Sequence, residues 1–323
     1  MVTKRILLAV IASAALFLST FASATAQQYP TRTVTLVVPL PPGQTADPVC
    51  RLIAEQLQTL LGQPFIVESR PGAGGNIGAE SVARAAPDGH TLLCAPEFTF
   101  LSHLLYPKLS FDPLKFEAVS VLATFPSVID GRATLPVANL AGLITYARSN
   151  PSKLNYASQG QGSMAHLTFE ALKMRAAIDL VHVPYRGGGP ALNDLLAGHV
   201  DLYAGPFVGS FPHIQAGKLK LLAVTSRNRI AAFPDVPTLT EVFPGLEVDT
   251  WMSIAAPPNT PPSITKKLSD AVLAAIQNPT VRARLAELHA EPLGSTPLEM
   301  RNRIGENLER WKPVVTAAKI TLD

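Results

Sequence analysis

Short apolar runs rich in β-branched residues alternate with helix-like segments along almost the whole chain. The first two runs are TVTLVV at residues 33–38 and FIVES at Phe65–Ser69. After each run comes a segment with apolar residues three and four positions apart, as in an amphipathic helix. Parallel strands need such helical connections, so the alternation is typical of α/β domains. We therefore predict an α/β fold with mostly parallel sheets.

Two stretches interrupt the alternation and are candidate connections between two lobes. Proline and glycine punctuate residues 125–140, and the segment FPDVPTLTEVFPGLEVDTW at 233–251 is similarly irregular. We predict that residues 27–128 and 249–323 form lobe 1 and that residues 129–248 form lobe 2. Two connections between the lobes would allow hinge closure around a ligand.

The N-terminus has the pattern of a secretory signal peptide. Lys4 and Arg5 precede an apolar run at 6–18, and small residues follow, ending in ATA at 24–26. The apolar run is shorter than the roughly 20 residues that a membrane span needs, which disfavours an uncleaved anchor. We predict that residues 1–26 are a signal peptide, cut before Gln27, and that the mature chain is exported and not membrane-embedded.

The mature chain carries almost no net charge. Removal of Lys4 and Arg5 leaves 25 of the 27 basic residues against 24 acidic ones, and no basic run or stripe occurs. This balance argues against nucleic acid or an anionic membrane surface as the partner. The two cysteines, Cys50 and Cys94, are compatible with a disulfide in an exported protein or with two buried small apolar residues.

Glycine-containing segments follow the first two predicted strands. PLPPGQTAD spans residues 39–47, and PGAGGNIG spans residues 71–78. Each lies between a strand and a helix, where backbone N–H groups and the positive end of the helix can hold an anion such as a carboxylate. The alternative is a turn that needs glycine only for its positive φ.

The sequence lacks the motifs of nucleotide cofactors, metal sites and hydrolytic catalysis. A dinucleotide fingerprint needs glycine where Ile77 stands, and no lysine completes a phosphate-binding loop. The segment GQGSM places its serine wrongly for a nucleophile elbow, and no H-E-x-x-H occurs. We therefore predict no cofactor, no metal and no catalytic residue. A periplasmic enzyme acting on organic acids is the less favoured alternative.

Eight segments spread along the mature chain carry a family resemblance. In chain order they are YPTRTVTLVVPLPPG, ESRPGAGGNIGAE, APDGHTLL, LNYASQGQGSMAHL, VHVPYRGGGPALNDLLAGHVD, GKLKLLAVTS, FPDVPTL and EPLGSTP. They resemble the Bug-type extracytoplasmic solute receptors, the substrate-binding proteins of tripartite tricarboxylate transporters. The resemblance implies a two-lobed, monomeric periplasmic binding protein of the Venus-flytrap type. Such a receptor closes on a small carboxylate and delivers it to the membrane components of the transporter; a receptor that contacts a signalling partner is the alternative.

The resemblance also implies which residues bind the ligand. The first loop departs from the family pattern, because Gln44 replaces a glycine and Ala46 replaces a serine or threonine. The second loop matches throughout. The predicted ligand-binding residues are Gly43, Gln44, Thr45, Ala46, Gly72, Ala73, Gly74, Gly75, Asn76, Glu97, Phe98, Ser158, Gly162, Ser163, His166, Tyr185, Arg186, Gly187, Pro206 and Phe207.

Several of these positions have a structural alternative. Ser163 can be a helix N-cap with His166 in the first turn facing it. Arg186 can be a surface residue rather than the cation for a distal carboxylate, and Glu97 can be a solvated loop charge. Asp47 is favoured as a helix cap over a ligand contact, because its carboxylate would repel an anion.

The ligand's chemistry is inferred from two departures from the family pattern. PEFTF at 96–100 replaces small polar residues, and GPF at 205–207 stands where relatives often carry Asp-Asn. Phe98, Phe100 and Phe207 can belong to the core or form an apolar wall for a ring. The missing acid disfavours a ligand with an amino group. We therefore favour an aromatic carboxylate or a dicarboxylate over citrate or an amino acid.

Overall fold

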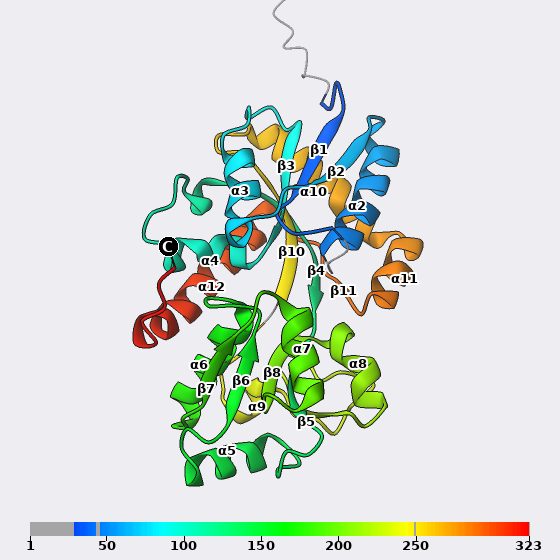
Figure 1. Ribbon diagram of the computed structural model, residues 1–323. Coiled ribbons are helices and arrows are strands. Elements are labelled where there is room, and N and C mark those ends of the chain that lie inside the picture. Colours follow the sequence, from blue (N-terminus) through cyan, green and yellow to red (C-terminus); the bar gives the residue numbers. More distant parts are fainter. Residues whose placement is uncertain (1–28, 43–45, 249, 323) are drawn as a thin grey trace, which may run out of the picture.

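The protein folds into two lobes, each built around one β-sheet (Figure 1). The computed structural model describes residues 29–42, 46–248 and 250–322. The predicted signal peptide therefore lies outside the described residues. The two-lobed α/β fold predicted from the sequence is confirmed by this arrangement.

Lobe 1 contains a six-stranded sheet in the order β11-β4-β10-β3-β1-β2. β1 lies between β2 and β3 and is parallel to both, with Val38 at its end opposite Ser69 of β2. β10 is antiparallel to its neighbours β3 and β4. The strands are β1 (Val34–Val38), β2 (Phe65–Ser69), β3 (Thr91–Pro96), β4 (Glu117–Phe125), β10 (Thr250–Ala256) and β11 (Glu291–Pro292).

Lobe 2 contains a five-stranded sheet in the order β7-β6-β8-β5-β9. β6 is parallel to β7 and β8, so the carboxyl ends of these three strands lie at one edge of the sheet. The strands are β5 (Ser127–Arg132), β6 (Asn155–Ser158), β7 (Val181–Pro184), β8 (Leu202–Pro206) and β9 (Leu219–Val224).

The expectation of mostly parallel sheets is wrong, because both sheets are mixed. Four strand pairings are parallel and five are antiparallel. The reason is the route between the lobes: β4 leads the chain out of lobe 1 and β10 brings it back, so these two neighbours run in opposite directions. β4 continues into β5 across Pro126, where the chain changes sheets. The lobe boundaries predicted at 128/129 and 248/249 stay a prediction.

Helices pack against the sheets of both lobes (Figure 1). Those of lobe 1 are α2 (Ala46–Leu61), α3 (Asn76–Ala83), α4 (Phe98–Leu105), α10 (Pro262–Gln277), α11 (Pro279–Glu287) and α12 (Pro297–Ala317). Those of lobe 2 are α5 (Leu140–Ser149), α6 (Met164–Ala176), α7 (Gly188–Ala197), α8 (Phe207–Gln215) and α9 (Leu239–Val242).

Local sequence signals explain where two of these helices begin. Thr296 and Glu299 form a capping box at the start of α12, with each side chain bonded to the other residue's backbone N–H. α2 begins at Ala46, so Asp47 lies inside its first turn and does not precede the helix. The prediction that Asp47 caps α2 is therefore wrong. There its carboxylate accepts a hydrogen bond from Arg51 Nε at 3.0 Å, an i,i+4 ion pair on the helix surface.

Cys50 and Cys94 form a disulfide that joins α2 to β3. Both residues are fully buried in the apolar core of lobe 1. Of the two alternatives left open by the sequence, the structure therefore shows the bonded one. A covalent link at this point fixes α2, whose first turn follows the first predicted ligand loop, against the central sheet.

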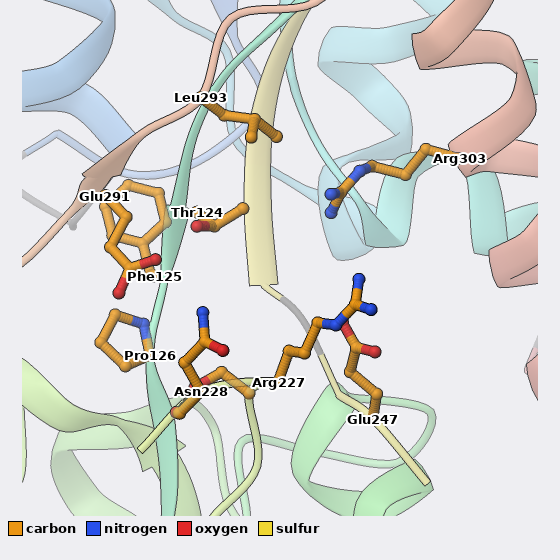
Figure 2. A pocket seen from close by; sticks show the side chains of 10 residues that line it. Thr124, Phe125, Pro126, Arg227, Asn228, Glu247, Glu291, Leu293 and Arg303 are labelled. Atoms are coloured by element: carbon orange, nitrogen blue, oxygen red, sulfur yellow. Dashed lines mark hydrogen bonds between the residues drawn. The ribbon is translucent and has the colours of Figure 1, made fainter. Parts of the chain in front are cut away.

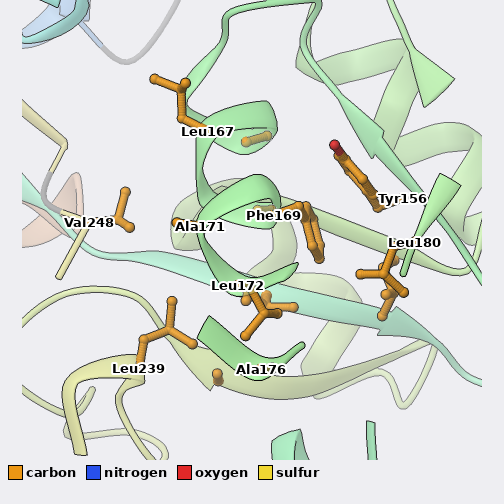
Figure 3. Close-up of a cluster of buried hydrophobic side chains, with 14 of the residues drawn as sticks. Tyr156, Leu167, Phe169, Ala171, Leu172, Ala176, Leu180, Leu239 and Val248 are labelled. Atoms are coloured by element: carbon orange, nitrogen blue, oxygen red, sulfur yellow. The ribbon is translucent and has the colours of Figure 1, made fainter. Parts of the chain in front are cut away.

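The two lobes also share buried apolar contacts through α12. Phe169 and Leu172 of α6 pack with Tyr156 of β6 in the core of lobe 2 (Figure 3). Trp311 and Val315 of α12 belong to the same cluster. The last helix therefore contacts lobe 2 through its C-terminal half and adds a third link between the lobes, beside the two chain crossings.

Candidate ligand site between the lobes

The two loops predicted to bind the ligand in lobe 1 follow neighbouring parallel strands. β1 and β2 pair in register up to Val38 and Ser69, so both loops leave the sheet at the same edge. Arg70 N–H donates to the Val38 carbonyl at 2.8 Å and extends this pairing into the loops. Residues 43–45 of the first loop, and with them Gly43, Gln44 and Thr45, lie outside the described residues. Ala46 is described only as the first residue of α2.

The second loop is a tight turn built from residues with positive φ. The φ values are 127° at Gly72, 47° at Ala73, 63° at Gly74 and 94° at Gly75. Residues other than glycine rarely adopt such angles, which explains three glycines in four positions. Gly75 N–H donates to the Gly72 carbonyl at 2.9 Å, and α3 begins at Asn76. The turn therefore brings backbone N–H groups and the positive end of α3 to the end of β2.

Close packing between the two loops requires a further glycine. A Cβ atom at Gly78 would lie 2.7 Å from the Arg70 carbonyl oxygen and 2.9 Å from Pro39 Cα. Pro39 belongs to the first loop, so this loop touches the first turn of α3 through Gly78. A Cβ atom at Gly75 would lie 3.4 Å from both Pro39 and the Phe98 ring. Phe98 therefore lies beside the glycine turn and is half-buried.

Glu97 is not the solvated charge that one alternative predicted. Its side chain is buried, and its carboxylate accepts a hydrogen bond from the Trp251 backbone N–H at 3.2 Å. Glu97 N–H in turn donates to the Trp251 carbonyl at 3.1 Å. Glu97 thus joins the start of α4 to β10, at the position that precedes Phe98 in the chain.

Lobe 2 brings together the predicted residues that follow β6. Ser163 is the N-cap of α6, as the structural alternative predicted, and its hydroxyl donates to the Gly160 carbonyl at 2.7 Å. Gly162 has a φ of 74° and donates its N–H to His166 Nδ1 at 3.0 Å. Ser158 is fully buried at the end of β6. These contacts hold the turn after β6 in one conformation.

A histidine that the sequence analysis missed supports the same turn. His182 of β7 lies with its Nε2 atom 2.7 Å from Ser158 Oγ, and its ring stacks on His166 with centroids 3.9 Å apart. Ser158 Oγ also lies 3.0 Å from the Gly160 carbonyl, so this serine–histidine contact ties down the turn. Burial and the neighbouring His166 lower the pKa of His182 to about 4, and burial lowers the pKa of His166. Both imidazoles are therefore neutral near pH 7. No motif marked His182, because its partners are distant in sequence.

The loop after β7 lies against the loop after β6. Tyr185 N–H donates to the Ser158 carbonyl at 3.0 Å, and Gly187 N–H donates to the Gln159 carbonyl at 3.2 Å. The Tyr185 hydroxyl donates to Asp194 of α7 at 2.6 Å. Arg186, between these anchors, is exposed. The predicted residues of lobe 2 are thus brought to one edge of the sheet; their contact with a ligand stays a prediction.

Two of the three phenylalanines considered for an apolar wall are buried in the protein interior. Phe100 is 2% exposed and stacks on Trp251 with ring centroids 5.7 Å apart. Phe207 is also 2% exposed and contacts Phe211 and His289, with centroids 5.1 and 5.5 Å away. Phe207 therefore takes part in an aromatic contact between α8 and the segment after α11; its contact with a ligand stays a prediction. Pro206, which precedes it at the end of β8, is half-buried.

A cavity of about 220 Å³ lies at the crossing between the lobes, away from these loops. Figure 2 shows the side chains of Arg303 and Arg227 pointing toward this space from above and below, with the Glu247 carboxylate beside Arg227. None of its lining residues belongs to the predicted ligand loops; they are Thr124, Phe125, Pro126, Ser226, Arg227, Asn228, Glu247, Glu291, Leu293 and Arg303.

Within residues 29–42, 46–248 and 250–322, no group of three or more histidine, cysteine or acidic side chains could hold a metal ion. In the same part of the chain, no helix is both long and apolar enough to cross a membrane.

Comparison with known proteins identifies a family. Residues 49–320 match the family described as the tripartite tricarboxylate transporter family receptor. Protein BugT of Bordetella pertussis is 35% identical over 307 residues, which cover 93% of this chain and 94% of BugT.

Two solved structures from Rhodopseudomonas palustris have the same fold. Rpa4515 with adipate is 36% identical, with a TM-score of 0.80 over 91% of this chain and 100% of that chain. MatC (Rpa3494) with bound malate is 36% identical, with a TM-score of 0.76 over 89% of this chain and 100% of that chain. The chain therefore belongs to the tripartite tricarboxylate transporter receptor family, as the resemblance in its sequence motifs predicted.

Proposed function

We propose that the protein is a periplasmic receptor that captures a small dicarboxylate by lobe closure and delivers it to the membrane components of a tripartite tricarboxylate-type transporter. The observation that supports this most is the placement of the loops. Those of lobe 1 follow the parallel strands β1 and β2, and those of lobe 2 follow the parallel strands β6, β7 and β8. In α/β folds, ligands bind at the carboxyl ends of parallel strands.

One carboxylate of the ligand is held by the glycine turn of lobe 1. The N–H groups of Ala73 and Gly74 are candidate donors, because the N–H groups of Gly75 and Asn76 close the turn on itself. Hydrogen bonds to a charged acceptor contribute about 1.5–3 kcal/mol each. The positive end of α3 adds roughly 0.3–1 kcal/mol, or up to about 2 kcal/mol when partly buried. A backbone site of this kind needs no arginine.

The burial of two phenylalanines favours an aliphatic dicarboxylate. With Phe100 and Phe207 enclosed by other side chains, only Phe98 of the three remains beside the glycine turn. The two relatives of known structure hold adipate and malate, both dicarboxylates. An aromatic carboxylate is the second candidate, favoured by the position of Phe98.

The cavity at the crossing between the lobes is the less suitable site for an anion. Together with an adjoining cavity of about 110 Å³, it is lined by three arginines and three glutamates. This balance of charge leaves little net attraction for a carboxylate. The cavity is also lined by Phe125 and Pro126 at one chain crossing, so its shape changes when the lobes move.

A thermal-shift panel with matched ligands tests the proposed function. Adipate, malate, citrate, aspartate, benzoate, hexanoate and 1,6-hexanediol are each added to the mature protein. A dicarboxylate at 100 times its Kd should stabilise the protein by about 2.7 kcal/mol, while the diol, which lacks a carboxylate, should not. A shift with benzoate alone would select the aromatic candidate. No shift with any acid would contradict the carboxylate receptor.

A further inference from the structure

Tyr203 of β8 lies where the three loops of lobe 2 meet. Its hydroxyl accepts a hydrogen bond from Gln159 Nε2 at 2.8 Å, and Gln159 belongs to the loop after β6. A Cβ atom at Gly188, the first residue of α7, would lie 2.9 Å from the Tyr203 hydroxyl oxygen. A Cβ atom at Gly205, two residues further along β8, would overlap the Tyr203 ring and hydroxyl. The phenol end therefore fills the space between these two glycines.

The conformation of Tyr203 depends on these neighbours. Residues 203 and 205 lie on the same face of β8, so any side chain at 205 would compete with the ring for one position. Gln159 Nε2 also donates to the Ala204 carbonyl at 3.1 Å, which fixes the amide beside the strand. The ring body packs in the apolar cluster under α7 with Leu195. Tyr203 as a whole is 3% exposed, and its hydroxyl is held at the carboxyl end of the sheet, where a ligand needs to reach only this one atom and not the ring.

The hydroxyl retains its proton and can donate it. Burial raises the pKa of Tyr203 to about 12. Because Gln159 donates to the oxygen, the Tyr203 O–H is left to donate elsewhere, and the hydrogen bonds found among residues 29–42, 46–248 and 250–322 include none that it donates. The nearby first turn of α7 begins with Gly188 and Gly189, whose N–H groups precede the first intrahelical bonds.

We propose that Tyr203 is a specificity-determining residue that donates a hydrogen bond to the distal carboxylate of the ligand. This inference rests on the proposed function and names the group of lobe 2 that recognises the second carboxylate. With glycine at 205 and a phenol in that space, lobe 2 presents donors where an acidic side chain would present acceptors. The site therefore selects a second anionic group and disfavours an ammonium group.

Calorimetry with adipate and hexanoate tests the proposal, because the two ligands have the same chain length and differ by one carboxylate. In Tyr203→Phe, the Kd for adipate should rise roughly ten- to hundredfold, as expected for a lost hydrogen bond to a charged group. The Kd for hexanoate should stay within about twofold. Gln159 keeps its bond to the Ala204 carbonyl, so the variant should fold with the wild-type melting temperature.

A second variant moves the Tyr203 hydroxyl without removing it. Gly205→Ala should displace the Tyr203 ring and produce the same selective loss of adipate binding. Gly209→Ala is the matched control, because its Cβ atom would meet nothing closer than Leu192 at 3.9 Å, and it should bind as wild type. Unchanged adipate affinity in Tyr203→Phe, or equal loss for both acids, would overturn the role of Tyr203. Wild-type protein that binds neither acid would contradict the proposed function itself.

Discussion

We predict that the buried carboxyl group of Asp130 makes the stability of lobe 2 depend on pH. Asp130 of β5 is fully buried, and its Oδ2 atom accepts a hydrogen bond from the Ser210 hydroxyl of α8. Its Oδ1 atom has no hydrogen-bond partner among the described residues. Burial raises the pKa of Asp130 to about 7, from an ordinary value of 3.8. The folded protein therefore holds this proton more tightly than the unfolded chain does.

The direction of the effect follows from proton binding. Between pH 4 and 7 the unfolded chain has released the proton while the folded protein retains it, so the contribution of Asp130 to the free energy of unfolding falls as the pH rises. A difference of about 3 pKa units corresponds to at most about 4 kcal/mol, reached near pH 8. Asp130→Asn keeps an oxygen for Ser210 and cannot ionise. Its gain over wild type should therefore be smallest at pH 4 and grow by up to about 4 kcal/mol by pH 8.

Urea unfolding at pH 4.5, 6 and 8 measures this difference. A constant packing cost of the amide shifts all three values together, so only the change with pH is diagnostic. Asp179→Asn is the matched control, because Asp179 also accepts a hydrogen bond from a serine, Ser152, but is exposed. A difference between Asp130→Asn and wild type that does not change with pH would refute the reasoning.

Three further predictions concern the disulfide, a loop glycine and the missed histidine. Replacing Cys50 and Cys94 by serine should lower the free energy of unfolding by about 2–4 kcal/mol in urea, because the bond closes a loop with a sequence separation of 44; no loss would contradict it. Gly78→Ala should lower the free energy of unfolding by about 1–3 kcal/mol, because its Cβ atom would meet backbone atoms. Gly305→Ala should raise it by about 1 kcal/mol, because its Cβ atom would meet nothing. Equal effects of the two substitutions would contradict the close approach at Gly78. Since the folded pKa of His182 lies near 4, the contribution of His182 to stability should be lost from about pH 6.5 to 4, opposite in direction to that of Asp130. The difference in melting temperature between wild type and His182→Gln should therefore change over this range, and a difference that is independent of pH would contradict it.

Local signals predicted those parts of the fold that depend on short-range chemistry. The period of apolar residues identified α2 and the β-branched run identified β2, and a capping box at Thr296 marks the start of α12. The helix at Phe98–Leu105 was missed, because it has only eight residues and its buried face includes the polar Thr99 and Ser102, so no apolar stripe marks it. The mixed sheets were missed because the pairing of β10 with β3 joins residues about 160 positions apart.

In the candidate site, too, features that depend on neighbouring residues were predicted and features that depend on distant contacts were missed. The glycine turn and the Ser163 cap were both located from the sequence. Clustered glycines indicate a turn with positive φ, and a serine before a helix indicates an N-cap. His182 and Tyr203 act through contacts with other strands and loops, which a linear pattern does not contain. Phe207 contacts His289, a residue distant in sequence that belongs to the other lobe, and a linear pattern does not show this contact either.

A crystal structure of the mature protein with adipate would show directly where the ligand binds. We expect one carboxylate within about 2.7–3.2 Å of the backbone N–H groups of Ala73 and Gly74 and the other at the loops of lobe 2. Adipate bound instead in the cavity lined by Arg227 and Arg303, with the glycine turn empty, would contradict the proposed binding site.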